Sequence, residues 1–214
     1  MTSNIIETST CFCKKCSQKI INTDFPLFTY NRNSLNNMEY REFEKAVKSY
    51  ECPYCHTTGK IVPIDPEIVD TIIIFHNKGW LTKSSCGGYI ANKRKEFFTT
   101  FYVTFYLPTK WNSVDWFIRM VKPDDCLTCT LFYDKDISSN GSYTLRNQNL
   151  LCKIGLDTSM IKRSKEPTSE ELQFVYNLNK KAREAFMRFV LLLPDLTLDI
   201  PMFTKEGLIN PDTV

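Results

Sequence analysis

Two short stretches decide how the N-terminal part of this chain folds: Cys13-Lys-Lys-Cys16 and Cys52-Pro-Tyr-Cys55-His-Thr-Thr-Gly59-Lys60. A Cys-x-x-Cys pair lets two thiolates reach one metal ion from a tight turn, and two such pairs complete a tetrahedral Cys₄ site. The proline and glycine of the second stretch are typical of a zinc-ribbon knuckle. We therefore expect Cys13, Cys16, Cys52 and Cys55 to bind one structural Zn²⁺ ion.

The segment between the two pairs, residues 17–51, is longer than the roughly 12–20 residues of a compact ribbon. Residues 38–50 have a composition that favours a helix, with apolar side chains at helical spacing, and this predicts a helical insert. Cys11 offers a neighbouring thiolate as an alternative ligand to Cys13. The two-residue gap favours Cys13, and Cys11 is then a bystander thiol.

Composition is that of a globular protein, with 43% hydrophobic and 24% charged residues in 214. The net charge of +3 is too small to imply nucleic-acid binding by itself. Apolar runs are too short to span a bilayer, and no signal peptide is evident. Nine cysteines without an export signal indicate reduced thiols and metal rather than disulfides, so we expect a cytoplasmic protein without a membrane partner.

Helices and strands alternate after the ribbon. Asp65-Pro66-Glu67 predicts a helix start with Asp65 as N-cap, and Gly79 is placed to end that helix. The capping box Thr168-Ser-Glu-Glu171 opens a long helix that should reach about Leu193, before Pro194. A further helix is expected over residues 113–121. Strands are predicted over residues 80–83, 97–107, 126–133 and 143–154, with the last two forming an antiparallel pair.

This order of elements predicts an α+β (or α/β) fold in which an N-terminal zinc ribbon is fused to a mixed sheet covered by helices. The expected domains are a ribbon with a helical insert over residues 1–64 and an α/β domain over 65–194. Residues 195–214 are expected to form a C-terminal tail that wraps the surface.

A second candidate site follows the strand at residues 80–83. The turn Ser84-Ser85-Cys86-Gly87-Gly88-Tyr89 is rich in small residues, and its backbone N–H groups could cradle an anion or a cofactor carboxylate. A plain tight turn explains the same residues. Cys86 could act as a nucleophile only beside an activating base. His76 is expected to be a hydrogen-bonded, half-buried histidine rather than that base.

Basic residues give weaker signals. Lys14, Lys15, Lys19 and Lys60 could contact phosphate, or could offset the negative charge of the zinc-bound thiolates, and Lys93 and Arg94 are possible contacts for an anionic ligand. Cys126-Leu-Thr-Cys129 has metal-ligand spacing but lies in a strand-like run, where the two side chains would point to opposite faces. Cys152 is expected in the core.

Residues 67–134 resemble the wybutosine-synthesis methyltransferase family, whose signature is a helix, a short strand containing threonine and then Ser-Ser-Cys-Ser-Gly-Arg. Ser84, Ser85, Cys86 and Gly88 match that motif, whereas Gly87 replaces its serine and Tyr89 its arginine. The resemblance implies S-adenosylmethionine as cofactor and transfer RNA as substrate. The whole arrangement also resembles uncharacterised zinc-ribbon proteins of low-GC Gram-positive bacteria and their phages.

We therefore expect a zinc-binding protein that is not an enzyme and that binds a host protein, another macromolecule or a nucleotide. A phage-type origin would make inhibition of a host defence system one form of this function. The alternatives are an S-adenosylmethionine-dependent RNA methyltransferase and a nucleic-acid-binding regulator. A nucleotide could lie in a pocket lined by Trp80, Tyr89, Lys93 and Arg94.

Overall fold

The computed structural model describes residues 10–21, 45–90, 98–107, 126–137, 143–161 and 167–197. Several sequence predictions fall outside these ranges: the helix over 113–121, the contacts of Lys93 and Arg94, and the tail beyond residue 197. Of the helix expected over residues 38–50, residues 45–49 are described and are helical.

Three short strands form the sheet of the ribbon: β1 (Thr10–Cys13), β2 (Lys19–Ile20) and β3 (Ile61–Ile64). Their order is β2-β1-β3, and both pairings are antiparallel. Because side chains alternate along a strand, β1 contributes to two cores. Cys11 and Cys13 pack in a small cluster with Ile20 and Ile61, whereas Phe12 packs in the large core of the molecule.

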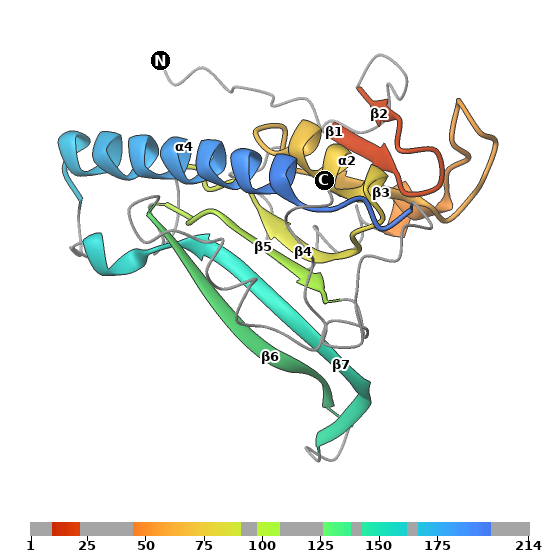
Figure 1. Cartoon of the computed structure of the whole chain (residues 1–214). Helices are drawn as coiled ribbons and strands as arrows, with labels where there is room; N and C mark the ends of the chain where they lie inside the picture. The colour runs from red at the N-terminus through yellow and green to blue at the C-terminus, as the bar shows by residue number, and fades with distance from the viewer. Residues whose placement is uncertain are drawn as a thin grey trace.

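The larger sheet has the order β4-β5-β7-β6 and is antiparallel throughout. It contains β4 (Thr82–Cys86), β5 (Tyr102–Tyr106), β6 (Leu127–Ile137) and β7 (Tyr143–Leu156). The predicted pairing of the last two strands is confirmed. In Figure 1 their far ends extend away from the helices. The strand expected over residues 97–107 is shorter, and the expectation of a mixed sheet is wrong for the described strands because every pair of them is antiparallel.

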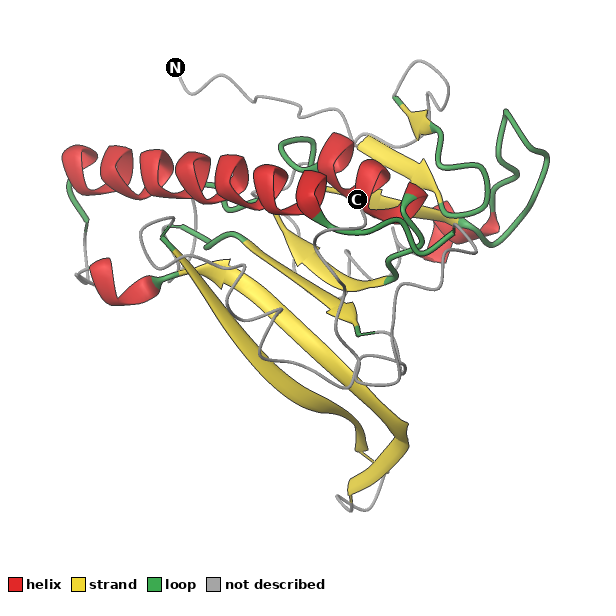
Figure 2. Cartoon of the chain, in the orientation of Figure 1, coloured by secondary structure: helices red, strands yellow, loops and turns green. Residues whose placement is uncertain are grey.

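Two helices lie on the same side of the larger sheet (Figure 2): α2 (Val69–Asn77) and α4 (Ser169–Leu192). The α4 prediction is confirmed, because Thr168 and Glu171 form the expected capping box and the helix ends before Pro194. A 3₁₀ turn, η2 (Thr158–Met160), follows β7. The fold is therefore α+β, as predicted.

The sequence predicted the C-terminal end of α2 correctly but not the cap at its start. Gly79, with φ of 82°, ends the helix as expected. At the start, Ile68 rather than Asp65 is the N-cap, and no side chain caps the helix. The carboxylate of Asp65 instead accepts a hydrogen bond from the backbone N–H of Gly87. The carboxylate that the local sequence predicted to cap α2 is therefore hydrogen-bonded to a residue outside the helix instead.

The C-terminal ends of α2 and α4 are joined by specific hydrogen bonds. Lys78 Nζ donates to the carbonyl oxygens of Val190, Leu191 and Leu193 at 3.0, 2.8 and 2.7 Å. Trp80 Nε1 donates to the carbonyl oxygen of Pro194 at 3.0 Å, and the Trp80 side chain is fully buried. Trp80 is therefore a core residue, which corrects the expectation that it lines a nucleotide pocket.

The large core lies between the helices and the sheet. Its largest buried side chains are aromatic, and they contact one another at ring-centroid distances of 4.9–6.0 Å: Phe75, Trp80, Phe101, Phe105, Phe186 and Phe189. Phe12 and Ile64 of the ribbon sheet belong to the same core. Within the described ranges, no helix combines the length and apolar content that a membrane span requires.

Candidate metal centre and adjoining pocket

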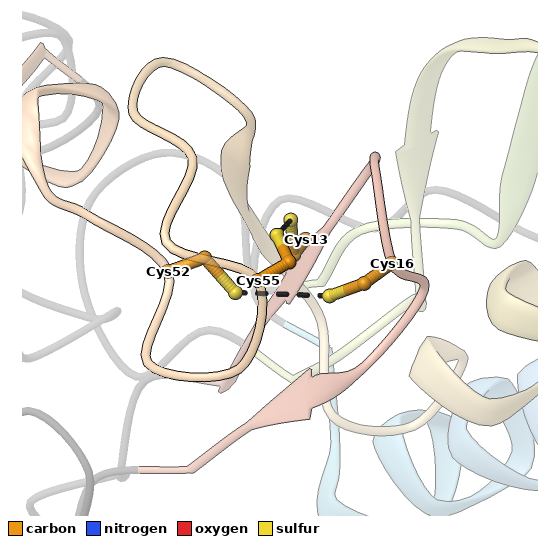
Figure 3. A group of neighbouring side chains, drawn as sticks. All are labelled: Cys13, Cys16, Cys52 and Cys55. Atoms are coloured by element: carbon orange, nitrogen blue, oxygen red, sulfur yellow. Dashed lines mark hydrogen bonds between the residues drawn. The ribbon is translucent and has the colours of Figure 1, made fainter.

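The four cysteines of the two Cys-x-x-Cys pairs converge on one point (Figure 3). Their sulfur atoms all lie within 4.8 Å of one another. Across the two pairs, Cys13 Sγ lies 3.6 Å from Cys55 Sγ, and Cys16 Sγ lies 3.7 Å from Cys52 Sγ. A tetrahedral site with metal–sulfur bonds of about 2.3 Å places its sulfurs roughly 3.8 Å apart. The four thiols therefore form a Cys₄ group that can hold a metal ion such as zinc.

The two knuckles share one backbone design. In each, the N–H of the first cysteine, Cys13 or Cys52, donates to the carbonyl five residues later at 3.0 Å. The carbonyl of the same cysteine accepts from the N–H four residues later, at 2.8 Å in the first knuckle and 2.9 Å in the second. Because both knuckles have the same turn, the two sulfur atoms of each knuckle point toward the same place.

The residue after each second cysteine adopts the left-handed conformation, with φ of 56° at Ser17 and 54° at His56. This conformation costs a non-glycine residue roughly 1–2 kcal/mol. Ser17 Oγ lies 3.2 Å from His76 Nδ1, and His56 Nδ1 lies 2.8 Å from a carboxylate oxygen of Glu51. The half-buried, hydrogen-bonded state expected of His76 is thereby confirmed.

The thiols of the cluster differ in how easily they lose a proton before any metal binds. Burial raises the pKa of Cys16 to about 12, because a thiolate is poorly solvated there. Burial also opposes ionisation of Cys55, but hydrogen bonds from Thr57 and from the thiols of Cys13 and Cys16 outweigh it and lower the pKa to about 6. Cys55 therefore ionises more readily than Cys16, and a divalent cation would favour ionisation of all four thiols.

Cys11 lies outside the four-sulfur group, although it is buried on the same face of β1 as Cys13. Burial raises the pKa of its thiol to about 12, which favours the neutral form. The arrangement of the sulfurs therefore favours Cys13 as the ligand and Cys11 as a bystander.

The candidate turn at residues 84–89 has a different structure from the one predicted. Ser84, Ser85 and Cys86 belong to β4 itself, so that only the two glycines and Tyr89 follow the strand. The N–H of Gly87 donates to Asp65, and the N–H of Tyr89 donates to Thr99 Oγ1 at 2.9 Å. Two of the backbone donors that could have cradled an anion are therefore used within the protein.

Helix α4 closes this turn from the other side. Arg183 Nη1 donates to the carbonyl oxygens of Gly87 and Gly88 at 2.7 and 3.2 Å. Gly88 has φ of 72°, and a Cβ there would lie 2.3 Å from Asn179 Oδ1. The fully buried Asn179 bridges two backbone groups next to the turn: it accepts from Phe101 N–H and donates to the Thr99 carbonyl. Gly88 thus allows close packing against α4, whereas a Cβ at Gly87 would meet Asp65 and Glu67 instead.

The contacts of the Cys86 thiol include a hydroxyl group. Its Sγ lies 3.5 Å from the hydroxyl of Thr99, which does not abstract a proton at neutral pH. The two histidines of the chain bond to Ser17 and Glu51 instead. A hydroxyl contact by itself does not activate a thiol for nucleophilic catalysis.

Another thiol pair lies in the hairpin of β6 and β7. Cys129 Sγ and Cys152 Sγ are 3.4 Å apart, and Cys152 is fully buried, as expected for a core residue. Their hydrogen bond raises the pKa of Cys152 and lowers that of Cys129, as expected when Cys152 donates. Cys126 is also buried, but it lies outside this contact, and the pair does not form a cluster of three or more metal ligands in the described residues.

A pocket of about 460 Å³ adjoins the metal group, between β3 of the ribbon sheet and β4 of the larger sheet. Lys14, Lys48 and Lys83 line it, together with Asp65 and four residues that carry hydroxyl groups. The sequence singled out Lys14, Ser84 and Ser85, but not Lys48, Lys83 or Tyr102. The missed residues lie in segments that are far apart in the sequence. No local sequence pattern marks them, and only the fold brings them together. Lys19, another candidate, pairs with Asp70 at 3.0 Å.

Comparison with protein-family models, with curated proteins and with solved structures finds no match to this chain. The resemblances to the methyltransferase family and to phage-type ribbon proteins stay predictions.

Proposed function

We propose that this is a zinc-binding protein in which the ion is structural, and that it acts by binding another molecule rather than by catalysis. The observation that carries the proposal is the convergence of four sulfurs, with contacts of 3.6 and 3.7 Å across the two knuckles. Thiolate ligands at tetrahedral spacing suit Zn²⁺. A Cys₄ site has no open coordination position for a water molecule, so it supports a structural ion.

Zinc would supply cohesion that the ribbon lacks. Among the residues that the structure describes, the buried members of the small cluster beside the metal group are Cys11, Cys13, Ile20, Val47, Cys52 and Ile61. Three of these six are cysteines, so little apolar surface is buried apart from the thiols. Structural zinc in small modules contributes about 10–16 kcal/mol of apparent binding free energy, which also stabilises the fold.

A binding role is supported by what lies beside the ribbon. The only thiol of the candidate motif, Cys86, contacts a hydroxyl, and the carbonyl oxygens of the motif's two glycines accept hydrogen bonds from Arg183 of α4. The pocket between β3 and β4, in contrast, combines basic, hydroxyl and apolar side chains, as ligand pockets do. We propose that its ligand is a nucleotide or part of a host macromolecule.

Metal analysis of protein purified without chelator tests the zinc assignment, and one Zn²⁺ per chain is expected. Cys13→Ser should lose the metal and destabilise the protein. Cys11→Ser is the matched control, because Cys11 is buried two residues away on the same face of β1 and should leave the stoichiometry at one. A stoichiometry clearly below one, or equal metal loss in both variants, would refute the assignment.

The non-enzymatic part of the proposal has its own test. Zinc-loaded protein should release no heat of binding when titrated with S-adenosylmethionine. Saturable binding that is lost in Cys86→Ala, together with methyl transfer to RNA, would show that the protein is a methyltransferase instead.

A further inference from the structure

The pocket beside the metal group is lined by two outer strands. β3 is the outer strand of the order β2-β1-β3, and β4 is the outer strand of the order β4-β5-β7-β6, as far as the described residues go. Side chains of both strands line the pocket, and Figure 1 shows the two strands on neighbouring parts of the molecule. Its volume of about 460 Å³ falls within the range typical of small-molecule sites.

The pocket is basic. Among the described residues, Lys14, Lys48 and Lys83 line it together with one carboxylate, that of Asp65, so this part of the lining has a positive formal charge. Asp65 already accepts the Gly87 N–H, which partly satisfies its charge. The three lysines and Asp65 also make contacts within the protein, which a bound ligand would share. An excess of ammonium groups in one concave site favours an anionic ligand.

Residues that carry hydroxyl groups complete the polar part of the described lining. Thr82, Ser84 and Ser85 come from β4, and Tyr102 comes from its neighbour β5. Hydroxyls donate to phosphate oxygens, and lysine is a common phosphate ligand, so both kinds of side chain suit a phosphate group. A carboxylate would use fewer of these donors.

The opposite wall is apolar. Val62, Pro63 and Ile64 of β3 line the pocket, and the first two are only partly buried. Inorganic phosphate would leave this wall in contact with water, whereas the organic part of a larger ligand would cover it. The pocket therefore combines a site for phosphate with a site for an apolar or aromatic group.

We propose that this pocket binds a small organic phosphate of the nucleoside diphosphate type. Its phosphates would contact Lys14, Lys48 and Lys83, and its organic part would lie against Val62 and Pro63. The inference rests on the binding role proposed above and specifies its ligand class. The metal site would then help to position two of these lysines. Lys14 lies between the ligands Cys13 and Cys16. The carbonyl of Lys48 accepts a hydrogen bond from the N–H of Gly59, beyond the second knuckle, at 3.0 Å.

The test uses zinc-loaded full-length protein titrated with ADP and, separately, with pyrophosphate. ADP is expected to bind one site more tightly than pyrophosphate, because only ADP covers the apolar wall. The double variant Lys14→Gln/Lys83→Gln should weaken ADP binding by about tenfold or more, through loss of two charge-assisted contacts. Ser84→Asp, which adds a carboxylate to the exposed rim of the pocket, should weaken it similarly.

The matched control is Lys15→Gln/Lys180→Gln, which removes the same charge from two exposed lysines that do not line the pocket. It should bind ADP as the wild type does. No ADP binding at about 1 mM, equal weakening in both double variants, or equal affinity for pyrophosphate and ADP would overturn the proposal. Displacement of ADP by a much lower concentration of single-stranded RNA would also overturn it, in favour of a nucleic-acid surface.

Zinc content and thermal unfolding are measured for every variant. If the wild type holds one zinc but binds no ADP, the pocket assignment fails and the structural zinc remains. If zinc is absent from the wild type, the metal proposal fails independently of the ligand result.

Discussion

At the scale of single residues, glycines that resemble a ligand-binding motif serve packing. Gly88 lies where β4 meets α4, with Asn179 and the backbone of Phe101 within 3 Å of any Cβ. A motif of small residues after a strand indicates close approach of another group, but it does not say whether that group is a ligand or the protein itself. Here the structure supplies Asn179 and Arg183 as the approaching groups.

Gly88→Ala should therefore be much more destabilising than Gly59→Ala. Both glycines have φ of 72°, but a Cβ at Gly59 would meet nothing within 4 Å. Gly59→Ala should lower the free energy of unfolding by about 1–2 kcal/mol, the cost of the left-handed conformation. Gly88→Ala should cost at least about 2 kcal/mol more, because it also disrupts the buried hydrogen bonds of Asn179. Urea unfolding of zinc-loaded protein measures both, and equal costs would contradict the packing argument.

His76 should titrate below its usual pKa of about 6.5. Burial lowers its pKa first, and the nearby charge of Lys14 lowers it further. Since the unfolded chain binds this proton more readily, the stability contributed by neutral His76 is complete above pH 6.5. It is lost as pH falls from there through the lower, folded-state pKa.

An NMR titration of zinc-loaded protein measures the pKa of His76 directly, with His56→Gln used to assign the second histidine signal. Lys14→Gln should raise the pKa of His76, because it removes a repelling charge, whereas Lys15→Gln serves as the comparison on the same knuckle. A pKa at or above 6.5 in the wild type would show that the imidazole is not desolvated as the structure indicates.

The ligand set of the metal group could be predicted from the sequence because it depends on local geometry. Two sulfurs three positions apart reach one ion whatever the rest of the fold is. The role of Asp65 could not be predicted in the same way. Its local sequence predicts an N-cap, but its carboxylate accepts a hydrogen bond from Gly87, which directly follows β4. Local rules fail where a tertiary contact offers the same group a better partner.

At the scale of elements, the C-terminus of α4 is capped by a residue from another helix. The last turn of α4 contains no basic residue of its own. Lys78, the C-cap of α2, places its ammonium group at the exposed carbonyls of Val190, Leu191 and Leu193. A cation at this end also interacts favourably with the helix dipole.

Lys78→Met should lower the free energy of unfolding by about 1.5–3 kcal/mol, the range for hydrogen bonds to a charged group. It should also speed hydrogen exchange in the last turn of α4. Lys180→Met is the control, because Lys180 is exposed on the same helix and should change stability by less than about 0.5 kcal/mol. Equal effects of the two substitutions would mean that Lys78 does not cap α4.

The boundaries of α4 were predictable because a capping box and a proline flank the helix in the sequence. Strand β5 was predicted too long, since a run rich in aromatic and β-branched residues shows β-propensity but not where a partner strand stops. The pocket was not predictable at all. Lys14 lies in the first knuckle, Lys48 before the second knuckle and Lys83 in β4. Only the folded arrangement brings these three lysines together.

At the scale of the whole molecule, the predicted boundary between residues 64 and 65 passes through a continuous core. Phe12 of β1 and Ile64 of β3 pack with α2, with the larger sheet and with α4, in one cluster. Phe12 also contacts the ring of His76 edge-on, with centroids 5.7 Å apart. Lys19 of β2 pairs with Asp70 of α2 at 3.0 Å. The alternation of side chains along β1 therefore couples the metal group on one face to the main core on the other.

Removal of the metal should consequently destabilise the whole protein rather than the ribbon alone. Because Cys13 holds one end of β1 and Phe12 packs in the main core beside it, we expect calorimetry of zinc-loaded protein to show a single transition. That transition should shift to lower temperature when a chelator is added. Phe12→Ala should cost about 3–5 kcal/mol and weaken this coupling, so that chelator then affects mainly the ribbon. Two independent transitions in the wild type, with the upper one insensitive to chelator, would show that the ribbon folds as a separate unit and that the shared core contributes little to cooperativity.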